Sequence, residues 1–150
     1  MDAIFLYSDA PGNGRIVHKV DYIRRRLENI FKHVQITKAN SLDELDELVA
    51  LACSKFDVLV FAGGDGTFHR VVNAIAKEEK RPVIGYISSG TLNDFGKNFG
   101  ISRNVNKCLN IIKKGKIQMF DIGIINDKTY FAFVAAIGTF SEISYATKRK

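Results

Sequence analysis

The sequence predicts an α/β domain with a doubly wound, mostly parallel sheet, because buried strand patterns alternate with amphipathic helix patterns along the chain. Two observations favour this class. Apolar runs at residues 58–62 and 82–87 are typical of strands covered on both faces. The first run leads directly into a helical stripe formed by Phe68, Val71, Val72 and Ile75. In such sheets, ligands bind beyond the carboxyl ends of the strands.

The first third of the chain begins this alternation. Residues 3–7 form an apolar strand pattern, and residues 8–14 are a loop made of turn residues. Apolar positions from Ile16 to Ile30 then predict one long amphipathic helix. A short strand at 34–37 follows the helix.

The later elements repeat the pattern until it changes near the end. Ser41 and Glu44 have the spacing of a capping box, which predicts the start of a second helix. Ser102 is expected to cap a further helix that ends at Gly115. Two strands joined by a turn at 126–128 then predict a β-hairpin. We expect this hairpin, spanning 116–125 and 129–137, to begin a β-rich second domain within residues 117–150.

Composition bounds the class of protein. The chain has 150 residues, 46% apolar and 25% charged, which is enough for one substantial core and ordinary for a soluble domain. No apolar run approaches the roughly 20 residues of a membrane span, and no signal peptide pattern is present. Cys53 and Cys108 occupy apolar helical positions, so we interpret them as buried free thiols in a reducing, cytoplasmic setting.

The net charge of +6 leaves two explanations open. Basic residues concentrate at 24–26, 113–116 and 148–150. They are either solvated helix faces or a means of attraction to an anionic membrane surface or a polyphosphate. No aromatic-interleaved basic groove is visible, which argues against nucleic acid as a partner.

Residues 63–67, Gly-Gly-Asp-Gly-Thr, stand between a predicted strand and a predicted helix. A strand that turns sharply into a helix on glycines leaves unpaired backbone N–H groups, which form an anion site. The turn is not a Walker A loop, because no Gly-x-x-x-x-Gly-Lys-Ser/Thr occurs in the sequence. Asp65 is the only carboxylate in the turn, and a bridging Mg²⁺ would explain an acid beside a phosphate.

Two further carboxylates are candidates for the same ion. Asp94 ends the second unusual loop, and Asp121 lies within an apolar run where an unpartnered charge would be costly. Three carboxylates in one cleft suit Mg²⁺, which binds few protein oxygens and keeps its waters. Structural alternatives are a turn and cap residue for Asp65, a helix cap for Asp94 and a strand-edge residue paired with a lysine for Asp121.

Residues 61–75 and the block Gly90-Thr-Leu-Asn-Asp-Phe95 together resemble the diacylglycerol kinase catalytic domain. The similarity is greatest to bacterial soluble lipid kinases of the diacylglycerol and sphingosine kinase superfamily. The Gly-Gly-Asp-Gly-Thr core is shared with NAD kinases, whereas the Gly-Thr-x-Asn-Asp-Phe block favours the lipid kinases. Order and spacing match from residue 3 onward. The resemblance implies that residues 1–150 are a nucleotide-binding kinase catalytic domain that transfers the γ-phosphoryl group of ATP to a lipid hydroxyl.

The resemblance also implies site residues and partners. Asp65, Asp94 and Asp121 would act in catalysis and hold Mg²⁺ through water. Nucleotide contacts would come from three loops and the second strand: Ser8, Gly12, Gly14, Thr37, Gly63, Gly64, Asp65, Gly66, Thr67, Gly90, Thr91 and Asn93. Such catalysis is mostly positioning plus charge neutralisation. The expected partners are ATP and a lipid acceptor at a membrane surface, with a cytoplasmic or peripheral location and a homodimer left open.

The sequence departs from the family pattern in its first loop and at His69-Arg70. The first loop reads Ser-Asp-Ala-Pro-Gly-Asn-Gly where the family has Asn-Pro-x-Ser/Ala-Gly. Arg70 stands where an acid is common, which puts a base beside the phosphate turn. Family members also have a β-rich second domain that carries the general base, so we expect this chain alone to bind nucleotide but to turn over poorly.

Three alternatives stay open at this point. One is an NAD kinase-like enzyme that phosphorylates a soluble nucleotide. Another is a non-catalytic nucleotide or phospholipid sensor, favoured by the altered first loop and by Arg70. A plain structural domain is the third, but it would have no reason to place three glycine loops on one edge of a sheet.

Overall fold

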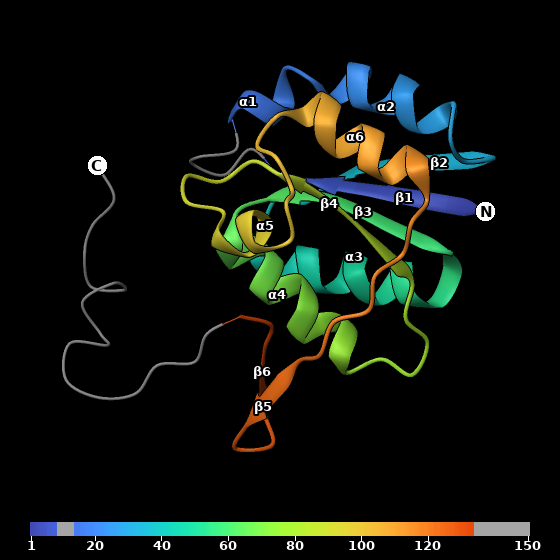
Figure 1. Ribbon diagram of the computed structural model, residues 1–150. Helices are drawn as coiled ribbons and strands as arrows, with labels where there is room; N and C mark the ends of the chain where they lie inside the picture. Colours follow the sequence, from blue (N-terminus) through green and yellow to red (C-terminus); the bar gives the residue numbers. More distant parts are fainter. Residues whose placement is uncertain (9–13, 134–150) are drawn as a thin grey trace.

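A four-stranded parallel sheet forms the middle layer of the computed structural model, which describes residues 1–8 and 14–133 (Figure 1). The strand order is β2-β1-β3-β4, which requires helical crossovers between the parallel strands. The four strands are β1 (Asp2–Tyr7), β2 (His33–Lys38), β3 (Val58–Gly63) and β4 (Val83–Ser88). The predicted doubly wound parallel sheet is confirmed.

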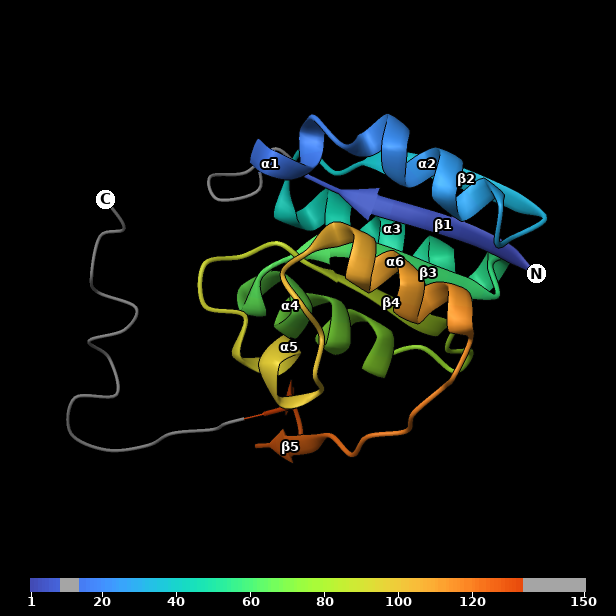
Figure 2. The same ribbon diagram turned by 45° about the horizontal axis from the view of Figure 1, so that its top comes forward.

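Helices cover both faces of the sheet, and Figures 1 and 2 show the two layers. One face carries α1 (Gly14–Val17), α2 (Val20–Glu28) and α6 (Val105–Lys114), and the other carries α3 (Leu42–Lys55) and α4 (Asp65–Ala76). Alternate side chains of β3 enter opposite cores, with Leu59 and Phe61 facing α3 and α4, and Val58 and Val60 on the other side. This double burial explains the unbroken apolar run of β3.

The single long helix predicted from Ile16 to Ile30 is wrong, because the chain breaks into α1 and α2 at His18 and Lys19. The Lys19 N–H donates to the carbonyl of Ile16, three residues back, at 2.8 Å, which tightens the turn and ends α1. β-Branched Val17 and Val20 flank the break, and such side chains fit helices less well. The apolar pattern survives the break, since Ile16 is still buried.

The start of α6 is also corrected. Its N-cap is Asn104 rather than Ser102: the Asn104 Oδ1 accepts from the N–H groups of Asn106 and Lys107 at 2.9 and 3.3 Å. Ser102 instead accepts from the Asn104 N–H through its Oγ at 3.1 Å. The helix ends as predicted at Gly115, whose φ of 63° suits glycine.

Both cysteines are buried free thiols, as predicted. Within residues 1–8 and 14–133, no helix is long and apolar enough to cross a bilayer.

The predicted hairpin forms, but its strands are short. Strands β5 (Gly123–Ile125) and β6 (Thr129–Phe131) pair antiparallel, and Asn126 and Asp127 make the turn with φ of 52° each. Residues 116–122 form no strand, and 134–137 lie outside the described residues. The expected β-rich second domain stays a prediction.

Asn73 attaches this hairpin to α4. Its Nδ2 donates to the Tyr130 carbonyl at 2.7 Å, and its Oδ1 accepts from the Tyr130 N–H at 2.9 Å. The side-chain amide therefore takes the place of a neighbouring strand for one residue of β6. An isolated two-stranded hairpin is marginal in water, so this attachment matters for its position.

Replacing Asn73 with alanine is expected to free the hairpin from α4. Each lost hydrogen bond contributes about 1 kcal/mol, so exchange of the Tyr130 amide should accelerate by about tenfold or more. Hydrogen exchange followed by NMR measures this directly. Asn106→Ala, at an exposed position of α6, is the matched control and should leave that amide unchanged. Undiminished protection of Tyr130 in Asn73→Ala would show that other contacts hold the hairpin.

Candidate functional site

The three loops singled out from the sequence begin at one edge of the sheet. They follow the carboxyl ends of β1, β3 and β4, and because the strands are parallel these ends share an edge (Figure 1). Ser8 directly follows β1 and Gly14 is the first residue of α1, whereas Gly12 lies outside the described residues. The Ser89 N–H donates to the Gly63 carbonyl at 2.9 Å, so the second and third loops are in direct contact.

Gly64 and Gly90 bring the backbones of these two loops together. A Cβ added to Gly90 would lie 2.4 Å from the Gly64 Cα, and one added to Gly64 would lie 3.0 Å from the Gly90 Cα. Gly64 itself is extended, with φ of −95°. Glycine is therefore needed here for close backbone approach and not for a left-handed conformation.

Gly66 differs from its neighbours in the turn. A Cβ at this position would meet no atom of the described residues within 4 Å, so neither their packing nor the backbone conformation requires a glycine. Gly66 lies in the first turn of α4, and no side chain within residues 1–8 and 14–133 caps this helix. The first N–H groups of α4 are thus left for solvent or a ligand beside open space, as an anion site requires.

Asp65, half-buried in the same turn, connects α4 to the short helix α5 (Asp94–Asn98). Its Oδ1 accepts from the Phe95 N–H at 3.1 Å. The carboxylate therefore caps α5 from a different helix, so the capping role weighed from the sequence exists and joins the two motifs. A negative charge near the N-termini of both helices is favourable.

Asn93 holds the loop after β4 in shape. It is fully buried with φ of 53°, and its side-chain amide accepts from the Gly90 N–H at 2.9 Å and donates to the Gly90 carbonyl. Nearby, the Tyr86 hydroxyl donates to the Gly63 carbonyl at 3.0 Å, and burial raises the pKa of Tyr86, which keeps this donor protonated. The side chain of Asn93 is occupied by the loop itself, whereas Thr91 is exposed. Nucleotide contacts by these two residues stay predictions.

An aromatic cluster draws together the segments that carry the predicted carboxylates. Phe68 and Phe95 are stacked with ring centroids 3.6 Å apart, and Phe120 lies 5.5 Å from Phe95 and 6.2 Å from Phe68. These rings follow Asp65 by three residues, follow Asp94 by one and precede Asp121 by one, respectively. The packing of three rings thus positions three acidic segments from distant parts of the chain.

The carboxylates themselves differ in surroundings. Asp94 is half-exposed and forms an ion pair with Lys97 at 3.0 Å. The expectation that Asp121 lies in a buried strand is wrong: it is exposed, because β5 begins only at Gly123. Across residues 1–8 and 14–133, no three His, Cys, Asp or Glu side chains are grouped to ligate a metal directly. Binding of Mg²⁺ through water by the three aspartates stays a prediction.

A pocket of about 210 Å³ opens beside the turn, on the α3 and α4 side of the sheet. We call it the edge pocket; its lining, mostly apolar, includes Leu6, Ser8, Ser41, Leu45, Phe61 and Thr67. Ser8 and Thr67 thus line the same pocket, and their contact with a nucleotide stays a prediction. Thr37 is not among the lining residues, and its hydroxyl accepts from Gln35 at 3.2 Å. The sequence did not indicate that the start of α3 contributes to this pocket, although the capping box marked the start of that helix.

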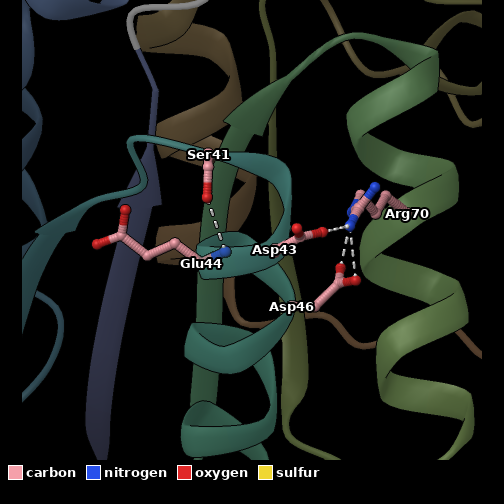
Figure 3. A network of polar contacts seen from close by, with 5 residues as sticks. All are labelled: Ser41, Asp43, Glu44, Asp46 and Arg70. Carbon is pink, nitrogen blue, oxygen red and sulfur yellow. Dashed lines mark hydrogen bonds and ion pairs between the residues drawn. The ribbon is translucent and has the colours of Figure 1, made fainter.

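Arg70 is not directed at the phosphate turn as the sequence suggested. Its Nε and Nη2 donate to the two carboxylate oxygens of Asp46 at 2.9 and 2.8 Å, and Nη2 also donates to Asp43 at 3.0 Å (Figure 3). Hydrogen bonds to Asp46 raise the pKa of Arg70 above its usual value. The charge of Arg70 is therefore neutralised by α3, which removes one of the two observations favouring a sensor.

Comparisons with known proteins agree on one family. Residues 2–125 match the family model described as diacylglycerol kinase catalytic domain. Over 95 residues the chain is 43% identical to a diacylglycerol kinase of Staphylococcus carnosus strain TM300, covering 63% of this chain and 31% of that protein. A diacylglycerol kinase of Staphylococcus aureus strain NCTC 8325 matches at 43% over 95 residues, covering 63% and 30%.

A solved structure gives the same result. A diacylglycerol kinase from Bacillus anthracis strain Sterne superposes with a TM-score of 0.79 at 25% sequence identity. The superposition covers 87% of this chain and 45% of that one. The matched part of the chain therefore covers less than half the length of each of these relatives.

Proposed function

The chain belongs to the diacylglycerol kinase catalytic domain family, and we propose that it is the ATP-binding part of a lipid kinase that phosphorylates a lipid hydroxyl. The observation that carries the proposal is the junction of the two motifs, where Asp65 accepts from the Phe95 N–H and Gly64 touches Gly90. This junction sits beside both an uncapped helix start and the edge pocket. We propose a diacylglycerol-like acceptor, presented at a membrane surface, because the relatives are named diacylglycerol kinases.

The geometry suggests which part of the site would hold the phosphates of ATP and which would hold its base and ribose. The uncapped start of α4 and the open space at Gly66 suit the phosphates, because backbone N–H groups there have no intrahelical partner. The edge pocket is mostly apolar with a few polar groups, which suits a base and ribose. Thr67 belongs to both regions and would contact the nucleotide where they meet.

The acidic residues fit Mg²⁺ in its usual protein environment. Mg²⁺ keeps several waters and needs few direct carboxylate ligands, so the spread of Asp65, Asp94 and Asp121 over three segments is compatible with contact through water. Bound there, the ion would neutralise negative charge on the phosphates. The aromatic cluster would keep the three segments in place, and Asp65 would remain oriented by the Phe95 N–H.

Calorimetric titration of this chain with ATP and ADP, with and without Mg²⁺, tests the nucleotide part of the proposal. ATP is expected to bind, and Mg²⁺ is expected to strengthen the binding. A transfer assay with labelled ATP, offering diacylglycerol in mixed micelles and NAD⁺ in parallel, tests the acceptor. Absence of ATP binding contradicts the proposal, and label on NAD⁺ instead of lipid identifies the NAD kinase-like alternative as correct.

A further inference from the structure

Two helices contribute lining residues to the edge pocket. The start of α3 contributes Ser41, Leu42 and Leu45, and the first turn of α4 contributes Thr67. The dimensions of the pocket therefore depend on how far the start of α3 lies from α4. A contact that joins these two helix segments therefore bears on the shape of the pocket.

The start of α3 has little apolar attachment of its own. Leu42 is 62% exposed, and burial begins only at Leu45. The capping box is internal: Ser41 Oγ accepts from the Glu44 N–H at 3.1 Å, and the Glu44 carboxylate accepts from the Asn40 N–H at 2.7 Å. These bonds begin the helix but do not fix it to α4.

Arg70 supplies that link. It follows Thr67 by three residues and therefore lies on nearly the same side of α4, while its partners Asp43 and Asp46 each follow a pocket-lining leucine of α3 by one residue (Figure 3). The contact with Asp46 is bidentate, which fixes distance and orientation together. The link thus joins the two helix segments that contribute to the pocket lining.

The solvent exposure of the Arg70 ion pairs indicates how much they add to stability. Arg70 is 30% exposed, Asp46 42% and Asp43 95%. Ion pairs this exposed add little to global stability, typically about 0–1 kcal/mol. A planar two-pronged contact between two helices is better suited to setting geometry than to holding the fold together.

We propose that Arg70 is a positioning residue that sets the separation of α3 from α4 and thereby the affinity of the edge pocket for the nucleotide. This inference rests on the proposed function in so far as the nucleotide is ATP. Arg70 acts through the backbone of α3 and touches no substrate. The departure from the family pattern at this position thus gives the pocket a wall fixed by an arginine.

Arg70→Ala tests the inference against a matched control. Arg26→Ala also removes an arginine that joins two helices, since Arg26 in α2 donates to Asn110 in α6 at 2.7 Å on the other face of the sheet. Arg70→Ala is expected to weaken ATP binding about tenfold, as for other residues that couple elements around a site, whereas Arg26→Ala leaves it unchanged. The double variant Arg70→Asp/Asp46→Arg is expected to recover most of the lost affinity.

A measurement without ligand separates this inference from the proposed function. Hydrogen exchange at the Glu44 and Leu45 amides is expected to accelerate in Arg70→Ala and not in Arg26→Ala. If the wild-type chain fails to bind ATP, the proposed function and the effect on affinity both fail, and exchange alone decides the positioning role. Equal exchange and equal ATP affinity in the two single variants would overturn the inference.

Discussion

Replacing Gly90 with alanine is expected to lower the free energy of unfolding by about 3 kcal/mol, at the upper end for overpacking substitutions. The added methyl group would lie 2.4 Å from the Cα of Gly64 and 2.9 Å from the Asn93 Oδ1. Neither neighbour yields easily, because Gly64 is backbone between β3 and α4 and Asn93 is fully buried. Urea denaturation followed by circular dichroism measures the effect.

Gly66→Ala is the matched control for this prediction. It adds the same methyl group in the neighbouring turn, two residues after Gly64, into space where none of the described residues lies within 4 Å. Its stability should stay within about 0.5 kcal/mol of wild type, or rise slightly because alanine favours the helix. ATP binding should weaken instead, since the methyl group enters the space assigned to the phosphates. Equal stability of the two variants would mean that the contact of Gly64 with Gly90 does not require glycine.

Asp65→Asn is expected to lower phosphoryl transfer by about a hundredfold, the scale of losing one group that stabilises transition-state charge. Asparagine keeps an oxygen that can accept from the Phe95 N–H, so only the charge is removed. Asp65→Ala removes the charge and the capping contact together, and should also destabilise the protein by about 1 kcal/mol. Steady-state kinetics over a range of Mg²⁺ concentrations distinguish the two effects. Unchanged Mg²⁺ dependence of nucleotide binding and transfer in Asp65→Asn would exclude this carboxylate from the metal site.

Strands and helices whose burial leaves a clear pattern of apolar residues could be predicted from the sequence. Strand β3 reads as one unbroken apolar run because both of its faces are covered, and α4 shows its buried stripe at helical spacing. The gathering of the candidate loops also followed, because parallel strands bring the starts of the loops after β1, β3 and β4 to one edge. Local periodicity and one topological rule were enough for these features.

Features that depend on partners distant in the sequence could not be predicted in the same way. Arg70 was expected beside the phosphate turn, but Asp46, 24 residues earlier, takes its charge. Asp121 was expected in a buried strand, but the hairpin begins later and leaves it exposed. No local signal marks the break at Lys19 strongly enough to overcome the continuous apolar stripe. For Arg70, a tertiary contact that is absent from the local pattern decided the outcome.

The contact of Gly64 with Gly90 also limits how this protein can evolve. A clash between two side chains is commonly relieved by a second mutation that makes the partner smaller. Here each residue faces the backbone of the other, and glycine is already the smallest residue. No compensating substitution exists at the partner position, so the two loops can change only together through a rearrangement of their backbones.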